Sequence, residues 1–227
     1  MSAPRIVFMG TPPFAVSSLE ALHAAGIPIA AVVTAPDRPA GRGRQLRASA
    51  VKEAALRLGL KVLQPERLRD EGFLTELRAC AADLFVVVAF RMLPEVVWRM
   101  PPMGTINLHA SLLPQYRGAA PINRAVMDGE HGTGLTTFLL QQAIDTGDVL
   151  LQETLPIGAD ETAGELHDRM AAQGSALLVR TVYGLANGAI APRRQEEPAT
   201  GVRLREAPKL TTATGRIDWS WPSARVH

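Results

Sequence analysis

The stretch TINLHASLLPQYRGAAPIN, residues 105–123, combines the pattern of a strand, a loop and the start of a helix. It opens as a short apolar run in which Asn107 and His109 stand two residues apart. In an extended strand this spacing puts both side chains on one face. Proline and glycine residues then predict a loop, and Pro121 fits the first turn of a helix that follows it. Open α/β sheets bind their ligands where strands end, so we expect a ligand site here.

Strand-like and helix-like patterns alternate on both sides of this stretch. Continuous apolar runs at residues 5–10, 27–35 and 83–90 predict parallel strands buried on both faces, with the last one central. Between and after them, amphipathic patterns at 11–26, 51–60, 66–82, 121–130 and 159–188 predict helices. Two later segments, 133–142 and 148–157, are typical of a pair of strands. This alternation predicts an α/β domain.

Composition narrows the class of protein further. The chain has 227 residues, of which 47% are hydrophobic and 20% charged, enough for one large core. Its apolar runs are shorter than the ~18 residues of a membrane helix, and its first residues lack the layout of a signal peptide. A single cysteine, Cys80, excludes an internal disulfide. We therefore expect a cytoplasmic protein that makes no contact with membranes.

Basic residues gather in one segment although the net charge is only +2. Residues 36–52 contain prolines and glycines, which predict a loop. From residue 38 to residue 52 the basic side chains are Arg38, Arg42, Arg44, Arg47 and Lys52, with no acidic residue among them. The residues alone leave two interpretations open, a solvated surface loop or a segment that contacts phosphate.

Several common chemistries are excluded by what the motifs lack. The turn GTPPFA after the first strand has only Gly10 where a dinucleotide site requires three glycines, so we reject NAD binding. Ser111 follows His109 by two residues, without the glycines of a nucleophile elbow. His109 has no second His or Cys nearby, so we expect no metal.

An amide, an imidazole and a carboxylate remain as reactive groups. Asp145 lies in the turn AIDTGD between the two later strands, where turn formation alone would explain it. If Asp145 folds back onto His109, the three groups support acyl transfer without a covalent intermediate. The Asn107 amide can donate to an oxyanion, the imidazole can move a proton, and the carboxylate can orient the ring. Arg91 directly follows the central strand. Two interpretations are open for it, a residue beside the expected ligand site or a solvated arginine.

These motifs carry a resemblance to a known family. NLHASLLPQYRGAAPIN together with TGLTTFLLQQAIDTGDVL resembles the folate-dependent formyltransferases, whose Asn, His and Asp triad falls on Asn107, His109 and Asp145. FMGTPPFAV, DRPAGRGRQL and RGAAPIN are similar to the branch that acts on methionyl-tRNA. The resemblance covers residues 5–219.

The resemblance implies a Rossmann-like fold, an open and mostly parallel sheet with helices on both faces. It implies transfer of a formyl group from 10-formyltetrahydrofolate to the amino group of methionine on initiator tRNA, by a monomer without a metal. The implied folate-binding residues are Phe90, Arg91, Met92, Leu93, Ser111, Leu112, Leu113 and Pro114. The implied tRNA-binding residues are Arg38, Arg42 and Arg44. Many relatives have Tyr-Gly where this chain has Phe90-Arg91.

The resemblance also implies a domain organisation. Residues 1–190 correspond to the catalytic domain, and residues 191–227 to an extended linker with a short ordered patch around Ile217, Trp219 and Trp221. In the family a β-barrel follows the linker, and we expect this chain to correspond to the catalytic domain and linker without that barrel.

Two other functions remain open at this point. The first is a formyltransferase that acts on a small amine, glycinamide ribonucleotide or an amino-sugar nucleotide, although the basic loop around Arg42 argues against it. The second is a folate- or RNA-binding module without catalysis, although the complete set of Asn107, His109 and Asp145 argues against it.

Overall fold

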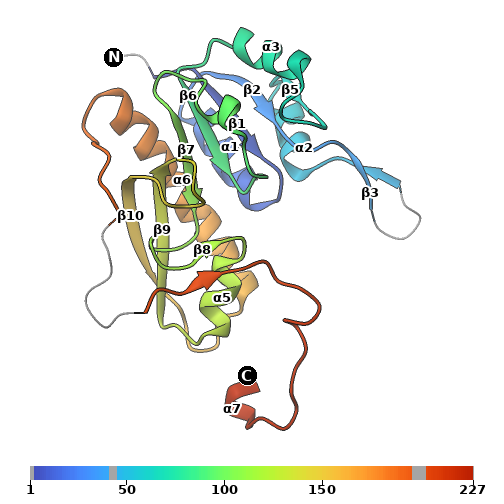
Figure 1. Cartoon of the computed structure of the whole chain (residues 1–227), viewed down its shortest axis with the longest axis vertical. Coiled ribbons are helices and arrows are strands. Elements are labelled where there is room, and N and C mark those ends of the chain that lie inside the picture. Colours follow the sequence, from blue (N-terminus) through green and yellow to red (C-terminus); the bar gives the residue numbers. More distant parts are fainter. Residues whose placement is uncertain (1–2, 41–44, 196–202, 227) are drawn as a thin grey trace.

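A seven-stranded sheet forms the centre of the protein in the computed structural model, which describes residues 3–40, 45–195 and 203–226 (Figure 1). The strand order is β10-β9-β7-β6-β1-β2-β5. The five strands from β7 to β5 are parallel, and β9 runs antiparallel to both of its neighbours. Their bounds are β1 Ile6–Gly10, β2 Ile29–Val33, β5 Val62–Leu63, β6 Leu84–Val88, β7 Thr105–His109, β9 Gly132–Leu139 and β10 Val149–Pro156. The expectation of an open, mostly parallel sheet is confirmed.

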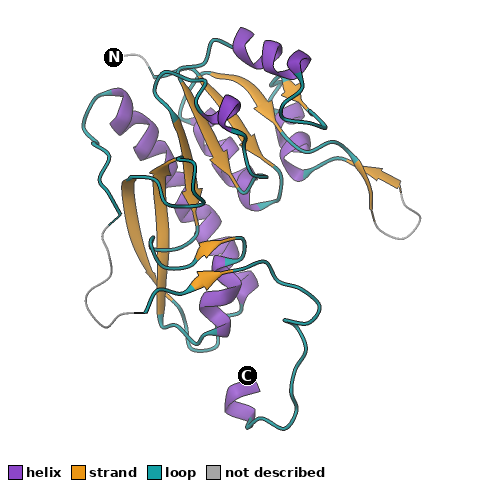
Figure 2. Cartoon of the chain, in the orientation of Figure 1, coloured by secondary structure: helices purple, strands orange, loops and turns teal. Residues whose placement is uncertain are grey.

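Helices cover both faces of the sheet (Figure 2). On one face, α1 Phe14–Ala24, α2 Ala50–Arg57 and α6 Ala163–Ala186 pack in a single cluster with Phe8 of β1 and Leu108 of β7. On the other face, α3 Glu71–Ala79 and α4 Glu95–Trp98 pack with Met9 and Val87. Adjacent residues of one strand belong to different clusters, which explains why these strands are continuous apolar runs.

The central strand and the long helix follow their sequence patterns. β6 is the fourth of the seven strands and is buried along its whole length, as predicted. α6 begins after Thr162, whose side chain accepts from the backbone N–H of Glu165 in a capping box. It continues without a break through Gly174, where a Cβ atom would lie 2.9 Å from a methyl carbon of Leu108. That glycine lets the helix approach the sheet closely.

The loop expected over residues 36–52 is wrong in part. β3 Arg38–Ala40 and β4 Gln45–Arg47 form a small antiparallel ladder that extends from the body of the molecule (Figure 1). α2 then begins after Ser49, whose hydroxyl accepts from the backbone N–H of Lys52. Proline and glycine content alone does not predict this pairing, because it joins two separate segments of the chain.

The C-terminal segment returns to the body of the molecule and forms a separate two-stranded sheet there. β11 Glu206–Ala207 pairs in parallel with β8 Arg117–Gly118, beside α5 Pro121–Met127. The chain then leaves the body and ends near α7 Ser223–Val226 (Figure 1). The side chains of Ile217, Trp219 and Trp221 are exposed, so the ordered patch expected around them is not a packed cluster. Among the residues that the structure describes, we find no helix with the length and apolar character needed to span a membrane.

Candidate active site

Three polar side chains meet at the carboxyl end of the parallel strands. Asn107 and His109 project from β7, and Asp145 lies in the turn between β9 and β10. All three line one cavity of about 660 Å³, together with residues that follow β1 and β6. Strand order reverses between β1 and β6, so the cavity lies at the switch point of the sheet, the usual ligand position in such folds. The predicted common face of Asn107 and His109 is therefore present.

The imidazole of His109 is buried and oriented at both of its nitrogens. Its Nε2 lies 2.9 Å from the backbone oxygen of Tyr116. A carbonyl only accepts, so Nε2 carries a hydrogen and donates it. Nδ1 faces the Asp145 carboxylate, with 3.8 Å between Nδ1 and Oδ2. Nδ1 is thus the ring nitrogen that remains available for proton transfer.

Backbone contacts hold the turn that carries Asp145. Its Oδ2 accepts from the N–H of Gly118 at 2.9 Å, and its carbonyl accepts from Nε of Arg117 at 3.0 Å. Gln195 donates to the same carbonyl at 2.7 Å. Asp145 itself has φ +52°, in the left-handed region that non-glycine residues seldom occupy. Such strain at a residue held by three partners is typical of functional sites.

The Asn107 amide is free to bind a ligand. Within residues 3–40, 45–195 and 203–226, no side chain or backbone group hydrogen-bonds to it. It is only partly buried, on a strand whose backbone pairs with Val87 and Phe138. A positioned amide on a rigid strand can donate to charge that develops on a carbonyl oxygen.

Residues 90–93, after β6, line the cavity as predicted. The Arg91 side chain does not extend into solvent, because its guanidinium donates to the carbonyls of Pro65 and Glu66. It also lies 5.6 Å above the ring of Phe90. Burial and the nearby charge of Arg38 lower the pKa of this guanidinium. Arg91 therefore fixes the loop that forms one wall of the cavity.

The second predicted wall, residues 111–114, is not among the residues that line this cavity. The Ser111 hydroxyl donates to the Gln115 carbonyl at 2.6 Å, and the N–H of Leu113 donates to Thr136. Leu112 lines a different cavity. This segment bonds to itself and to β9, and its part in folate binding stays a prediction.

Comparison of the sequence with known protein families identifies the family of this chain. Residues 4–182 match the family described as formyl transferase. The chain belongs to the formyl transferase family. It is 54% identical to the methionyl-tRNA formyltransferase of Porphyromonas gingivalis and 52% identical to that of Bacteroides thetaiotaomicron. Each alignment covers 98% of this chain and 69% of the relative.

Solved structures show the same formyl transferase fold at low sequence identity. Glycinamide ribonucleotide transformylase 1 from Symbiobacterium toebii superposes with a TM-score of 0.70 at 19% identity, over 86% of this chain and 95% of that one. WlaRD, a sugar 3N-formyl transferase solved with dTDP and 5-N-formyl-THF, gives a TM-score of 0.71 at 18% identity, over 100% and 77%. At these identities the likeness concerns the fold alone.

Sequence reasoning missed several side chains that line this formyl transferase site, and His167 is one of them. His167 of α6 lines the cavity, although a histidine within a helical pattern is typical of a surface or packing position. Its ring lies 5.3 Å from that of Phe14 in an edge-on arrangement, and its Nδ1 is 2.9 Å from the carboxylate of Asp168. The sequence carries no signal for this, because the contact joins the first turns of two helices far apart in the chain.

Of the side chains predicted to bind tRNA, Arg38 lies on the small ladder of this formyl transferase. Arg38 and Arg47 are both exposed and stand directly opposite each other on β3 and β4. Arg42 and Arg44 fall outside the described residues. Lys52 is not a free cation, because its ammonium lies 2.5 Å from the carboxylate of Asp37, just before the basic run.

Proposed function

We propose that this chain transfers a formyl group from 10-formyltetrahydrofolate to the amino group of methionine on initiator tRNA. The observation that carries the proposal is the convergence of Asn107, His109 and Asp145 on one cavity. Membership of the formyl transferase family and about half-identity with methionyl-tRNA formyltransferases support the choice of donor and acceptor.

The reaction needs charge stabilisation more than a strong base. An α-amino group has a pKa of about 7.7–8.0, and an ester neighbour lowers it, so much of the amine is neutral near pH 7. The amine nitrogen bonds to the formyl carbon, the bond from that carbon to N10 of the folate breaks, and one proton passes from the amine to N10. We assign the oxyanion to the Asn107 amide and the proton to Nδ1 of His109. Asp145 faces Nδ1 and helps to orient the ring.

The cavity suits the folate that would supply the formyl group. Its volume of about 660 Å³ lies in the range typical of small-molecule sites. Phe90, Leu93 and Trp98 give it apolar surface, and Asn107 and Asp145 give it polar groups at one end. Such a site matches a flat ring system whose reactive nitrogen must reach the triad.

The ladder of β3 and β4 supports a nucleic-acid acceptor. Like charges directly opposite each other, as on Arg38 and Arg47, destabilise a strand pair. A phosphate between them would relieve this repulsion. Leu46, between them in sequence, is 73% exposed and offers an apolar surface beside the charges. We propose that Arg38, with Arg42 and Arg44, contacts the acceptor end of the tRNA.

We further propose that residues 1–190 act as the catalytic domain and residues 191–227 as the linker. Because one chain supplies all three members of the triad, we propose a monomer as the active form. A cytoplasmic location belongs to the same proposal, since charged initiator tRNA is used there.

One assay separates this function from transfer to a small amine. The chain is given 10-formyltetrahydrofolate with methionyl initiator tRNA, with glycinamide ribonucleotide, or with an amino-sugar nucleotide, and the formylated product is measured. We expect formyl-methionyl-tRNA. Formylation of the small amines alone would refute the proposal.

A further inference from the structure

The short segment of residues 115–118 holds both His109 and Asp145. The carbonyl of Tyr116 accepts from Nε2 of His109, and the N–H of Gly118 donates to the carboxylate of Asp145. A shift of this segment would therefore change the distance between the imidazole and the carboxylate.

The strand β11 is hydrogen-bonded to this segment along its backbone. The N–H of Tyr116 donates to the carbonyl of Arg205 at 2.7 Å, and the N–H of Ala119 donates to that of Ala207 at 2.7 Å. Gly118 has φ +126°, and a Cβ atom there would lie 2.5 Å from the Ala207 oxygen. The backbones thus approach more closely than any other residue at this position allows.

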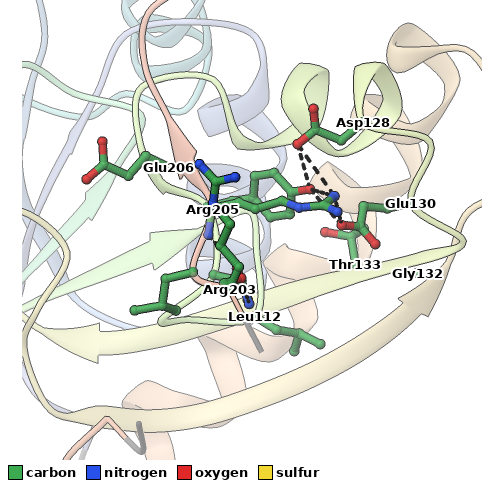
Figure 3. A pocket seen from close by; sticks show the side chains of 11 residues that line it. Leu112, Asp128, Glu130, Gly132, Thr133, Arg203, Arg205 and Glu206 are labelled. Atoms are coloured by element: carbon green, nitrogen blue, oxygen red, sulfur yellow. Dashed lines mark hydrogen bonds and ion pairs between the residues drawn. The ribbon is translucent and has the colours of Figure 1, made fainter. Parts of the chain in front are cut away.

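The side chain of Arg205 adds a second connection between β11 and the same segment. It donates to the Tyr116 hydroxyl at 3.1 Å and to the carboxylate of Glu130, and it lies 3.6 Å from that of Asp128. Figure 3 shows Arg205 extending toward Asp128 and Glu130 across a cavity of about 940 Å³. Tyr116 is only 5% exposed, and burial raises the pKa of its hydroxyl, which stays protonated. The cluster is therefore a fixed polar anchor.

We propose that β11 and Arg205 form a positioning device for formyl transfer, which acts through Tyr116 on the His109–Asp145 pair. The inference rests on the proposed function and assigns a role to the chain beyond its 182nd residue, where the family match ends. Neither Arg205 nor Tyr116 lines the cavity that holds the triad. Loss of the anchor therefore changes turnover and leaves the binding of both substrates intact.

Three variants test this arrangement through steady-state kinetics. Arg205→Ala removes the anchor, Arg205→Lys keeps one cation, and Arg203→Ala serves as the matched control. Arg203 lines the same outer cavity, but among the residues that the structure describes its side chain makes no hydrogen bond, and its backbone carbonyl accepts from Gln115. We expect Arg205→Ala to lower kcat on the order of tenfold with KM for folate and tRNA within twofold, since small misplacements of reacting groups slow the chemistry. Arg205→Lys should recover part of kcat, and Arg203→Ala should match the parent chain.

Nuclear magnetic resonance of the same variants reports on the His109 ring itself. The chain is labelled with ¹⁵N-histidine, and His109→Gln identifies the signals of that ring among the five histidines. In the parent chain we expect an Nε2-bound hydrogen that exchanges slowly because it is buried and donated. In Arg205→Ala we expect this signal to shift or to exchange faster. The signal is read from the folded molecules, so partial unfolding of the variant would not by itself produce this change.

The outcomes of these measurements distinguish failure of the positioning role from failure of the proposed formyl transfer to methionyl-tRNA. If the parent chain formylates methionyl-tRNA and Arg205→Ala keeps both kcat and the His109 signals, the positioning role is wrong. If KM rises and kcat is unchanged, the segment binds substrate and the inference is equally wrong. If the parent chain formylates no methionyl-tRNA, the proposed function fails, and the His109 signals still test the coupling.

Discussion

The imidazole of His109 and the carboxylate of Asp145 face each other, with 3.8 Å between Nδ1 and Oδ2. This separation is within ion-pair range and beyond that of a direct hydrogen bond. Catalytic hydrogen bonds are often long without substrate and tighten in the reacting complex. Both side chains are almost completely buried, so their interaction is poorly screened by water.

Replacement of either member of this pair should stop most turnover. We expect His109→Ala and Asp145→Asn each to lower kcat about 10²–10⁴-fold, because proton transfer loses its carrier or the charge that supports it. Folate affinity, measured by fluorescence titration, should change little. His131→Ala, in an exposed turn, is the control. Normal turnover in both variants would show that the triad assignment is wrong.

Loss of the Asn107 amide should reduce stabilisation of the oxyanion. Asn107→Ala should lower kcat about 10²–10³-fold, the usual effect of removing one such donor. Asn107→Asp keeps the size of the side chain and places a negative charge there, so we expect at least as large a loss. Single-turnover kinetics with saturating folate would measure both. An Asn107→Asp variant that is faster than Asn107→Ala would contradict this role.

The small basic ladder should control the salt dependence of tRNA binding. Arg38→Ala and Arg47→Ala should each weaken binding and reduce the slope of log K against log salt by about one, as expected for one lost phosphate contact. Filter binding between low and moderate salt provides the measurement. Arg180→Ala, on α6, removes an arginine that is paired with Glu153 and should leave the slope unchanged. Equal slopes in all four proteins would remove the ladder from the tRNA interface.

The contact between Asp37 and Lys52 should contribute stability above about pH 4 and lose it in acid. The hydrogen bond from Lys52 holds the pKa of the Asp37 carboxyl below its ordinary value, so folding favours the charged form. This contribution is present above the ordinary pKa of about 3.9 and is lost as the pH falls through the lower value in the folded chain. Thermal unfolding should show Asp37→Asn less stable than the parent at pH 7.

The same experiment at low pH completes this test. The difference in melting temperature between the parent and Asp37→Asn should shrink once the pH falls below about 4. Glu66→Gln, an exposed acid on the loop after β5, is the control and should melt like the parent at pH 7. A difference that stays constant from pH 7 to pH 3 would show that charge on Asp37 is not responsible.

Local sequence patterns were sufficient to predict the strands that are buried in the core. β6 and β1 are apolar along their length, and burial of both faces needs no other information. The capping box of Thr162 and Glu165 likewise lies within four residues. Family resemblance supplied the folate and tRNA expectations, which composition alone left open.

Contacts between distant segments were harder to predict. Residues 111–114 were expected to form a wall of the folate pocket, and the structure shows Ser111 and Leu113 bonded within their own turn and to Thr136, contacts that the sequence pattern did not indicate. His167 joined the cavity only because α6 packs beside α1. A helical pattern reports which face is buried, and it does not report which neighbour lies across that face.

Asn107 and His109 share a face because β7 is a strand, in which residues two positions apart point to the same side. The sequence alone therefore determined this relationship. The approach of Asp145, the support of Tyr116 by Arg205, and the pairing of β11 with β8 depend on tertiary structure. Those contacts close long loops, so their formation depends on the packing of the whole sheet against its helices. Hydrogen bonds between residues far apart in the chain form only where that packing has already brought their backbones together.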